Sequence, residues 1–137
     1  MANFSISQLV TAADCDAVLH ISEREKKDLD WRRHSLERQK EQYGEQAISI
    51  TAELAAKQTE LANLETFIAT LPESDYKKEQ VSKKVRAEFS IFLLNERKTN
   101  YGLVALLEKE LDYERIMNEI ATISAFITEV EARKAAI

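Results

Sequence analysis

Two histidines and one cysteine are the residues of this chain that most often bind metals or act as nucleophiles. His20 and His34 lie fourteen residues apart, which is about four turns of a helix. They therefore cannot share a metal ion within one helix, and neither has the Glu-x-x-His spacing of di-iron bundles. Cys15 is the only cysteine, so it forms no internal disulfide, and we interpret it as a small packed residue. We expect no catalytic residue, no metal, no cofactor and no enzymatic activity.

Glycine and proline are scarce, and this scarcity indicates the fold class. The chain has two glycines and one proline in 137 residues, whereas average usage would give about nine and seven. Sheets need many turns, and turns need these residues. Two separate glycines, Gly44 and Gly102, also cannot form a glycine-rich phosphate loop. The sequence therefore predicts an all-α protein.

A heptad repeat predicts how the helices pair. Small and apolar residues occupy most core positions of a heptad repeat that runs from Ala12 to Leu71, which is the pattern of a coiled-coil seam. Pro72 must end this segment because proline cannot donate to the helix ladder. We expect one domain, residues 1–137, that is a long antiparallel two-helix coiled-coil hairpin. Its expected parts are a lead-in (1–10), a first arm (11–71), a turn (72–75) and a second arm (76–137).

The second arm carries its own heptad, whose predicted core positions include Val81, Val85, Glu88, Phe92, Asn95 and Gly102. An antiparallel pairing of positions whose numbers sum to 149 aligns both seams. It places Leu54 opposite Asn95 and Ala47 opposite Gly102. It also places Lys40 opposite Lys109. The glycines and the like charges make the middle of the hairpin weak, and two interpretations stay open: a bend, or a close approach of the two backbones.

The second arm is more apolar than one seam requires. In a lone hairpin five of its residues would face water: Leu93, Leu94, Val104, Leu107 and Leu111. Together with Leu103 they form the predicted oligomer or partner interface. Exposed apolar surface of this extent usually marks an interface. We expect a homodimer in which two hairpins form a four-helix assembly. The alternative is that the same surface receives a protein client.

Cations gather just after the turn and form a predicted basic tip: Lys77, Lys78, Lys83, Lys84 and Arg86. Cations in the first helical turn oppose the helix dipole, so helix stability does not explain them. They serve either as solubilising charge or as a contact for an acidic partner, a membrane surface or RNA. Trp31 lies on an outward heptad position, where it either contacts a partner or covers its own helix.

The overall charge limits the partners. A net charge of −5 disfavours nucleic acid, which needs a positive footprint. The start of the chain lacks the features of a signal peptide, and no apolar stretch approaches the roughly eighteen residues of a transmembrane helix. We expect a cytoplasmic, non-enzymatic structural or interaction protein, acting as a scaffold, spacer or adaptor. The alternative is a chaperone-like module that binds clients on the apolar face of the second arm or at the basic tip.

Overall fold

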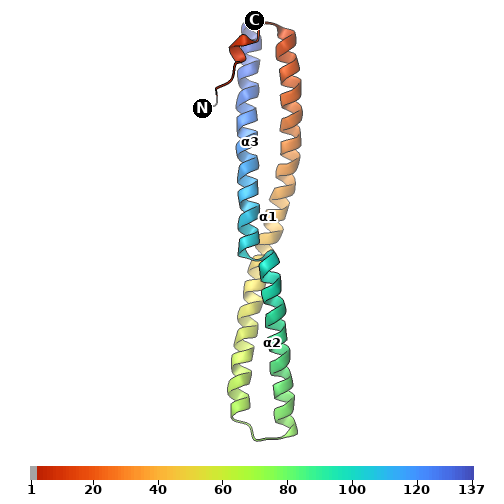
Figure 1. Cartoon of the computed structure of the whole chain (residues 1–137), viewed down its shortest axis with the longest axis vertical. Coiled ribbons are helices and arrows are strands. Elements are labelled where there is room, and N and C mark those ends of the chain that lie inside the picture. The colour runs from red at the N-terminus through yellow and green to blue at the C-terminus, as the bar shows by residue number, and fades with distance from the viewer. Residues whose placement is uncertain (1–2) are drawn as a thin grey trace. The chain divides into compact units, whose positions relative to one another are not determined.

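The computed structural model describes residues 3–137, and this part of the chain contains helices and no strand. A short 3-10 helix, η1 (Ile6–Gln8), precedes α1 (Ala12–Ala69), α2 (Asp75–Tyr101) and α3 (Leu103–Ala136) (Figure 1). The all-α class expected from the sequence is confirmed. The helices are long and packed together, as the sparse glycine and proline content predicts.

Side-chain caps and proline set the start of α1 and the two helix ends at the turn. The backbone N–H of Asp14 donates to Thr11 Oγ1 at 3.2 Å, which caps the start of α1. At the other end, Leu71 N donates to Ile68 O at 3.1 Å, so the chain tightens before Pro72. Ser74 then caps α2 by accepting from Lys77 N at 3.2 Å. The turn therefore lies close to where the sequence predicts it.

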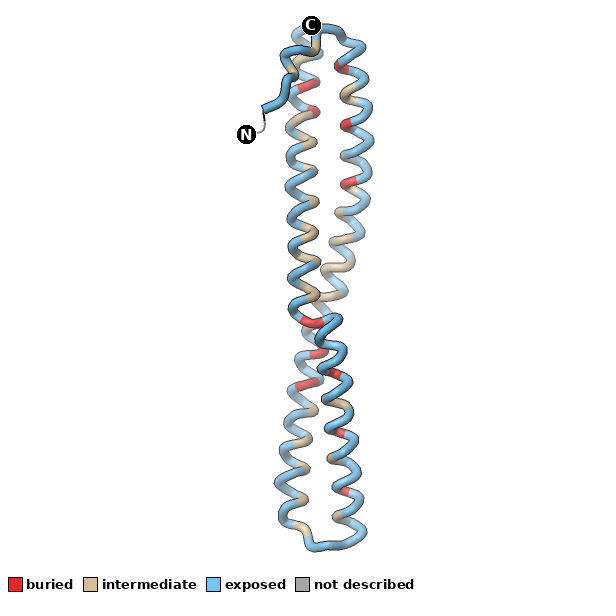
Figure 2. The backbone as a smooth tube through the Cα atoms, in the orientation of Figure 1, coloured by how far each residue is buried: buried red, intermediate tan, exposed pale blue. Residues whose placement is uncertain are grey.

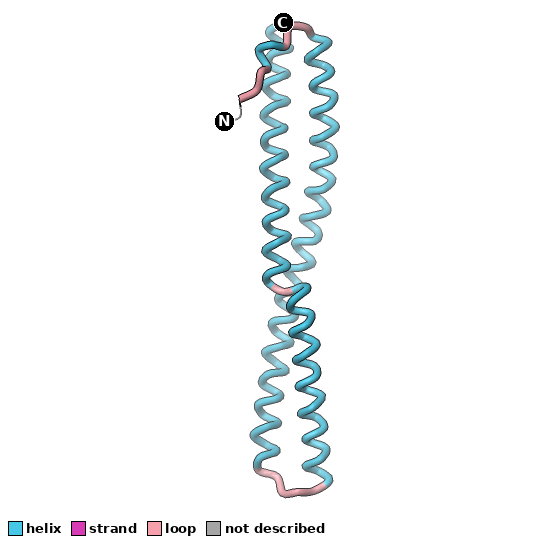
Figure 3. The backbone as a smooth tube through the Cα atoms, in the orientation of Figure 1, coloured by secondary structure: helices cyan, strands magenta, loops and turns pink. Residues whose placement is uncertain are grey.

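The predicted second arm is divided into two helices at Gly102 (Figure 3). This residue has φ −85° and ψ −161°, and its N–H donates to Lys98 O at 2.8 Å. A Cβ atom on Gly102 would lie 2.3 Å from that same carbonyl oxygen, so this backbone conformation requires glycine. Gly44 lies inside the continuous α1 helix, where a Cβ atom would meet only Leu106 Cδ1 at 3.9 Å. Of the two glycines, only Gly102 interrupts a helix.

The chain forms two compact units. We call residues 3–39 with 109–137 the terminal unit, because it contains both ends of the described chain, and residues 40–108 the turn unit. The predicted opposition of Lys40 and Lys109 would join the two units, and it stays a prediction.

In the terminal unit, α1 packs on α3. The buried residues are Cys15, Ser22 and Leu29 from α1 with Ile127 and Val130 from α3 (Figure 2). The three α1 residues recur every seven residues, and Ile127 and Val130 occupy two successive core positions of the heptad predicted for α3. Here the predicted seams agree with the observed burial.

The lead-in is tied to the last turns of α3. The rings of Phe4 and Phe126 meet edge to face, with centroids 4.8 Å apart. Arg133 donates from Nε to Leu9 O at 2.9 Å and from Nη2 to Ser7 O at 3.2 Å. These bonds fix the segment before α1 onto the same unit.

In the turn unit, the second half of α1 and α2 run in opposite directions (Figure 1). Ile50 and Leu54 of α1 form a buried cluster with Leu94 of α2, and Ile91 packs against it. Nearer the turn, Lys84 Nζ lies 4.0 Å from Glu65 Oε1. Residues with higher numbers in α1 therefore contact residues with lower numbers in α2, as two antiparallel helices require.

The predicted seam of α2 is wrong by one residue. Val81, Val85 and Phe92 were expected in the core, yet 40%, 57% and 57% of their surface is exposed. The buried residues of α2 are Gln80, Ala87 and Leu94. Leu54 accordingly clusters with Leu94, and the predicted partner Asn95 is exposed.

The break at Gly102 explains this displacement. The heptad that was extended backwards from α3 assumed one continuous helix, in which each residue adds a fixed rotation. The interruption adds one residue to the seam, so α3 keeps its predicted phase whereas α2 is rotated relative to the prediction.

Candidate protein–protein interface

The residues with metal-binding or nucleophilic chemistry do not come together. His20 and His34 are exposed, and Cys15 is fully buried at 0% exposure. Within residues 3–137, no three His, Cys, Asp or Glu side chains are grouped so that they could hold a metal ion.

Exposed apolar side chains are the main chemical feature of the described chain. Eight hydrophobic residues are buried, whereas nineteen large hydrophobic residues are exposed. The described chain alone thus leaves many apolar side chains in contact with water, which is unfavourable.

Part of this surface is a stripe that we call the outer face of α2. Val81, Val85, Phe89 and Phe92 are 40%, 57%, 60% and 57% exposed. Their spacing of four, four and three residues places them on one side of the helix, away from the buried Gln80–Ala87–Leu94 side. The Phe89 and Phe92 rings stack with centroids 6.4 Å apart. This face is apolar along about three turns of helix.

A second apolar surface begins directly after Gly102. Leu103, Val104 and Leu107 of α3 are 61%, 78% and 52% exposed, and we call them the α3 ridge. Leu111, in the terminal unit, is 53% exposed. Val104, Leu107 and Leu111 were expected to face water, and Leu103 was expected in the interface.

An apolar groove of about 720 Å³ lies beside the ridge in the turn unit. It is lined by small and apolar residues of α1 and by the residues around the helix break: Gly44, Ala47, Ile48, Ile50, Thr51, Ala52, Ala55, Lys98, Gly102, Leu103 and Leu106. Ile48 is 75% exposed at this groove. The short side chains leave space between the helices that an apolar group of another molecule could occupy.

The six residues of the predicted interface therefore divide into two groups. Leu93, at 47%, and the four residues of α3 are exposed, whereas Leu94 is only 7% exposed. Leu94 belongs to the core of the turn unit, with Ile50 and Leu54. Its expected exposure is wrong because the α2 seam passes through it.

The heptad pattern did not identify the outer face of α2. It placed Val81, Val85 and Phe92 at core positions, and Phe89 was neither a predicted core residue nor a predicted interface residue. A signal was present, because Gln80, Ala87 and Leu94 recur every seven residues. A glutamine and an alanine make this repeat less conspicuous than a run of valine and phenylalanine, so the pattern favoured the wrong side.

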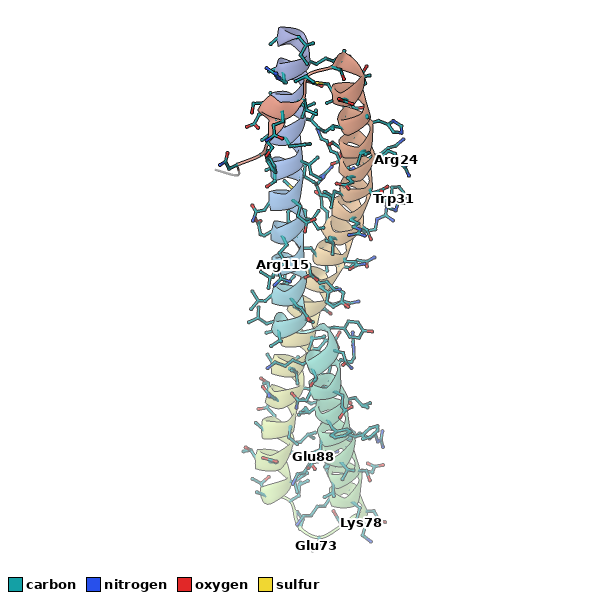
Figure 4. All side chains as sticks on the ribbon, turned by 45° about the horizontal axis from the view of Figure 1, so that its top comes forward. Arg24, Trp31, Glu73, Lys78, Glu88 and Arg115 are labelled. Atoms are coloured by element: carbon teal, nitrogen blue, oxygen red, sulfur yellow. The ribbon has the colours of Figure 1, made fainter. Side chains whose placement is uncertain are left out.

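The basic tip is partly neutralised by acids of the same chain. Lys77 Nζ lies 2.9 Å from Glu73 Oε1, and Lys84 lies 3.9 Å from Glu88 Oε1. No ion pair within 4.0 Å joins Lys78, Lys83 or Arg86 to an acid in the described chain. Figure 4 places Glu73 and Lys78 together at the turn end of the unit. The unpaired positive charge is therefore smaller than the sequence indicates.

Trp31 remains an isolated exposed aromatic residue of the terminal unit. Its side chain is 78% exposed and projects from the same side of α1 as Arg24, one heptad earlier (Figure 4). Its surroundings are therefore those of a surface residue.

One ion pair shifts a pKa in the terminal unit. Lys134 donates to Asp16 Oδ1, and this hydrogen bond together with the negative charge of Asp16 raises the pKa of Lys134 above its ordinary value. Both groups are exposed to solvent, so the pair resembles ordinary surface ion pairs rather than a catalytic arrangement.

Among the described residues, no helix combines the length and apolar character needed to cross a membrane. Comparison of the chain with protein-family models, with curated proteins and with solved structures gave no significant match.

Proposed function

We propose that this chain is a non-enzymatic interaction protein of the cytoplasm, an antiparallel coiled-coil hairpin that works as a homodimeric scaffold, spacer or adaptor. The observation that carries this proposal is the excess of exposed over buried apolar side chains, concentrated on the outer face of α2 and on the α3 ridge. Surfaces of this kind become stable when another protein covers them.

The hairpin part of the proposal is supported by the contacts inside each unit. In the turn unit, α1 and α2 are joined by the short segment 70–74 and run in opposite directions. In the terminal unit, buried positions of α1 and α3 follow the heptad spacing of coiled-coil seams. Long helices with exposed apolar stripes suit a protein that acts through contacts with other proteins.

The dimer part rests on the exposed apolar residues. Val85, Phe89 and Phe92 of α2 are 57–60% exposed, and the residues of the α3 ridge are 52–78% exposed. Apolar side chains gathered in this way usually mark a protein–protein interface.

Light scattering after gel filtration of the full chain tests the proposal. We expect a mass of twice 15.7 kDa that does not change on dilution through the micromolar range. Replacing Val104 and Leu107 with Asp serves as a first probe of the ridge, with circular dichroism as a check on helicity. A wild-type chain that stays monomeric at every concentration contradicts the homodimer.

A client-binding, chaperone-like role is the second candidate, and the apolar groove of about 720 Å³ favours it. Ile48→Asp places a charge at the exposed edge of this groove. A client-binding protein should slow the aggregation of an unfolded model protein, and this variant should lose that effect while keeping its mass. Equal behaviour of wild type and variant removes the second candidate.

A further inference from the structure

We propose that the outer face of α2 pairs with the same face of a second copy of this chain, in antiparallel orientation, around a two-fold axis near residue 87. This inference rests on the proposed homodimer and specifies which surface forms it and in which direction the helices run.

Three residues of the outer face belong to a longer stripe with the spacing of a coiled-coil seam, and Val81 lies beside this stripe. Its members follow one another at intervals of four, three, four, three and four residues: Lys78, Ser82, Val85, Phe89, Phe92 and Glu96. This alternation keeps a line of side chains on one side of a helix. The three large members are 57–60% exposed, and the opposite side of α2 is already occupied by the packing of Leu94 against α1. The helix thus carries two seams, of which one lacks a partner within the turn unit.

The sequence of this face is complementary to its own reverse. In an antiparallel pair each layer joins an a position to a d position. With the axis near residue 87, Val85 packs against the partner's Phe89, and Ser82 packs against the partner's Phe92. A small side chain therefore lies opposite a large one, and two medium-to-large apolar side chains fill the centre. The two-fold axis repeats each layer, as an isologous interface requires.

Charge at the two ends of the stripe selects the antiparallel direction. Lys78 lies opposite the partner's Glu96, and symmetry forms this pair twice. A parallel pairing would instead place lysine against lysine and glutamate against glutamate, which is repulsive. Neither Lys78 nor Glu96 forms an ion pair with another residue of the described chain, so both charges are available.

The flanking charges do not oppose this arrangement strongly. Arg86 and Glu88 lie on the two edges of the stripe, where each faces its own copy near the two-fold axis, and solvent screens these like-charge contacts. Glu88 is also 3.9 Å from Lys84 of its own chain, which offsets its charge. The direction of pairing is therefore decided at Lys78 and Glu96.

Reciprocal charge exchange in the full chain tests the inference. Lys78→Glu and Glu96→Lys each replace two attractive pairs with two repulsive ones, and each should weaken dimerisation roughly tenfold in sedimentation equilibrium at low salt. The double variant K78E/E96K restores opposite charges and should return the dissociation constant to within about threefold of wild type. Lys83→Glu makes the same charge change on α2 outside the stripe and should leave dimerisation unchanged.

The outcomes separate this inference from the proposed function. Weakening by both single variants without recovery in the double variant overturns the antiparallel register. A dimer that none of the variants affects overturns the use of the outer face but leaves the homodimer in place, formed through another surface such as the α3 ridge. A monomeric wild-type chain overturns both. Circular dichroism of each variant shows whether helicity is retained.

Discussion

The terminal unit and the turn unit are built from the same kind of helix, yet they treat their apolar residues differently. In the terminal unit the heptad positions of α1 and α3 are the buried ones, including Cys15, Leu29 and Val130. In the turn unit the buried side of α2 includes Gln80 and Ala87, whereas Val85 and Phe92 are exposed. The difference shows that a one-residue shift of a seam can convert predicted core into outer surface.

The cause of that shift is local and can be removed. A helix that continued through residue 102 would carry the phase of α3 into α2 and bury Val85 and Phe92. The glycine break prevents this, because its extended ψ of −161° interrupts the regular rotation. The comparison of the two units can therefore be tested at the seam, at the break and at the end of the terminal unit.

The largest expected effect concerns neighbouring leucines of α2. Leu94→Ala removes a side chain that is 7% exposed in the core cluster and should lower the free energy of unfolding by about 2–4 kcal/mol. Leu93→Ala, at a residue that is 47% exposed, should cost less than about 1 kcal/mol. Urea unfolding followed by circular dichroism measures both. Equal losses would show that the seam does not pass through Leu94.

A somewhat smaller effect is expected at the break. Gly102→Ala brings a Cβ atom to 2.3 Å from Lys98 O, so the local backbone must move, and we expect a loss of about 1–3 kcal/mol in the free energy of unfolding. Gly44→Ala is the matched control. Its Cβ atom finds space at 3.9 Å from the nearest atom, and alanine favours a helix interior by about 1 kcal/mol. A Gly102→Ala variant with a higher free energy of unfolding would contradict this, because it would show that α2 and α3 can form one continuous helix without destabilising the chain.

The smallest expected effect is a pH dependence at the end of the terminal unit. Because Asp16 raises the pKa of Lys134, the stabilisation is fully present below the ordinary lysine pKa of about 10.4 and is lost as the pH rises through the raised value. Asp16→Asn should remove this part of the decline in Tm at alkaline pH. The comparison of the wild-type and variant Tm profiles checks it, and parallel profiles contradict the assignment.

The sequence was sufficient for the all-helical class, for the turn near Pro72 and for the seams of α1 and α3, because these depend on composition, on proline geometry and on an uninterrupted heptad. It was insufficient for α2, because the heptad was extended through Gly102 as if the helix continued. A glycine can occupy a helix interior at modest cost, as Gly44 does. Only the clash between a Cβ atom at residue 102 and Lys98 O distinguishes the two glycines.

The exposure of the surplus apolar residues was predicted in the same partial way, and their role as an interface stays a prediction. Leu103, Val104, Leu107 and Leu111 were identified as surplus apolar residues on one side of α3, and they are exposed. The outer face of α2 could not be identified in this way, since its residues satisfied a plausible seam. Burial in the folded chain, rather than periodicity alone, separates the two seams of α2.

The central claim is that the outer face of α2, rather than the exposed surface of the terminal unit, forms the homodimer. One aromatic residue from each surface tests it: Phe89, 60% exposed, and Trp31, 78% exposed. In sedimentation equilibrium we expect Phe89→Asp to yield a species of 15.7 kDa and Trp31→Asp to keep twice that mass. A dimeric Phe89→Asp variant, or a Trp31→Asp variant that is monomeric instead, would contradict the account.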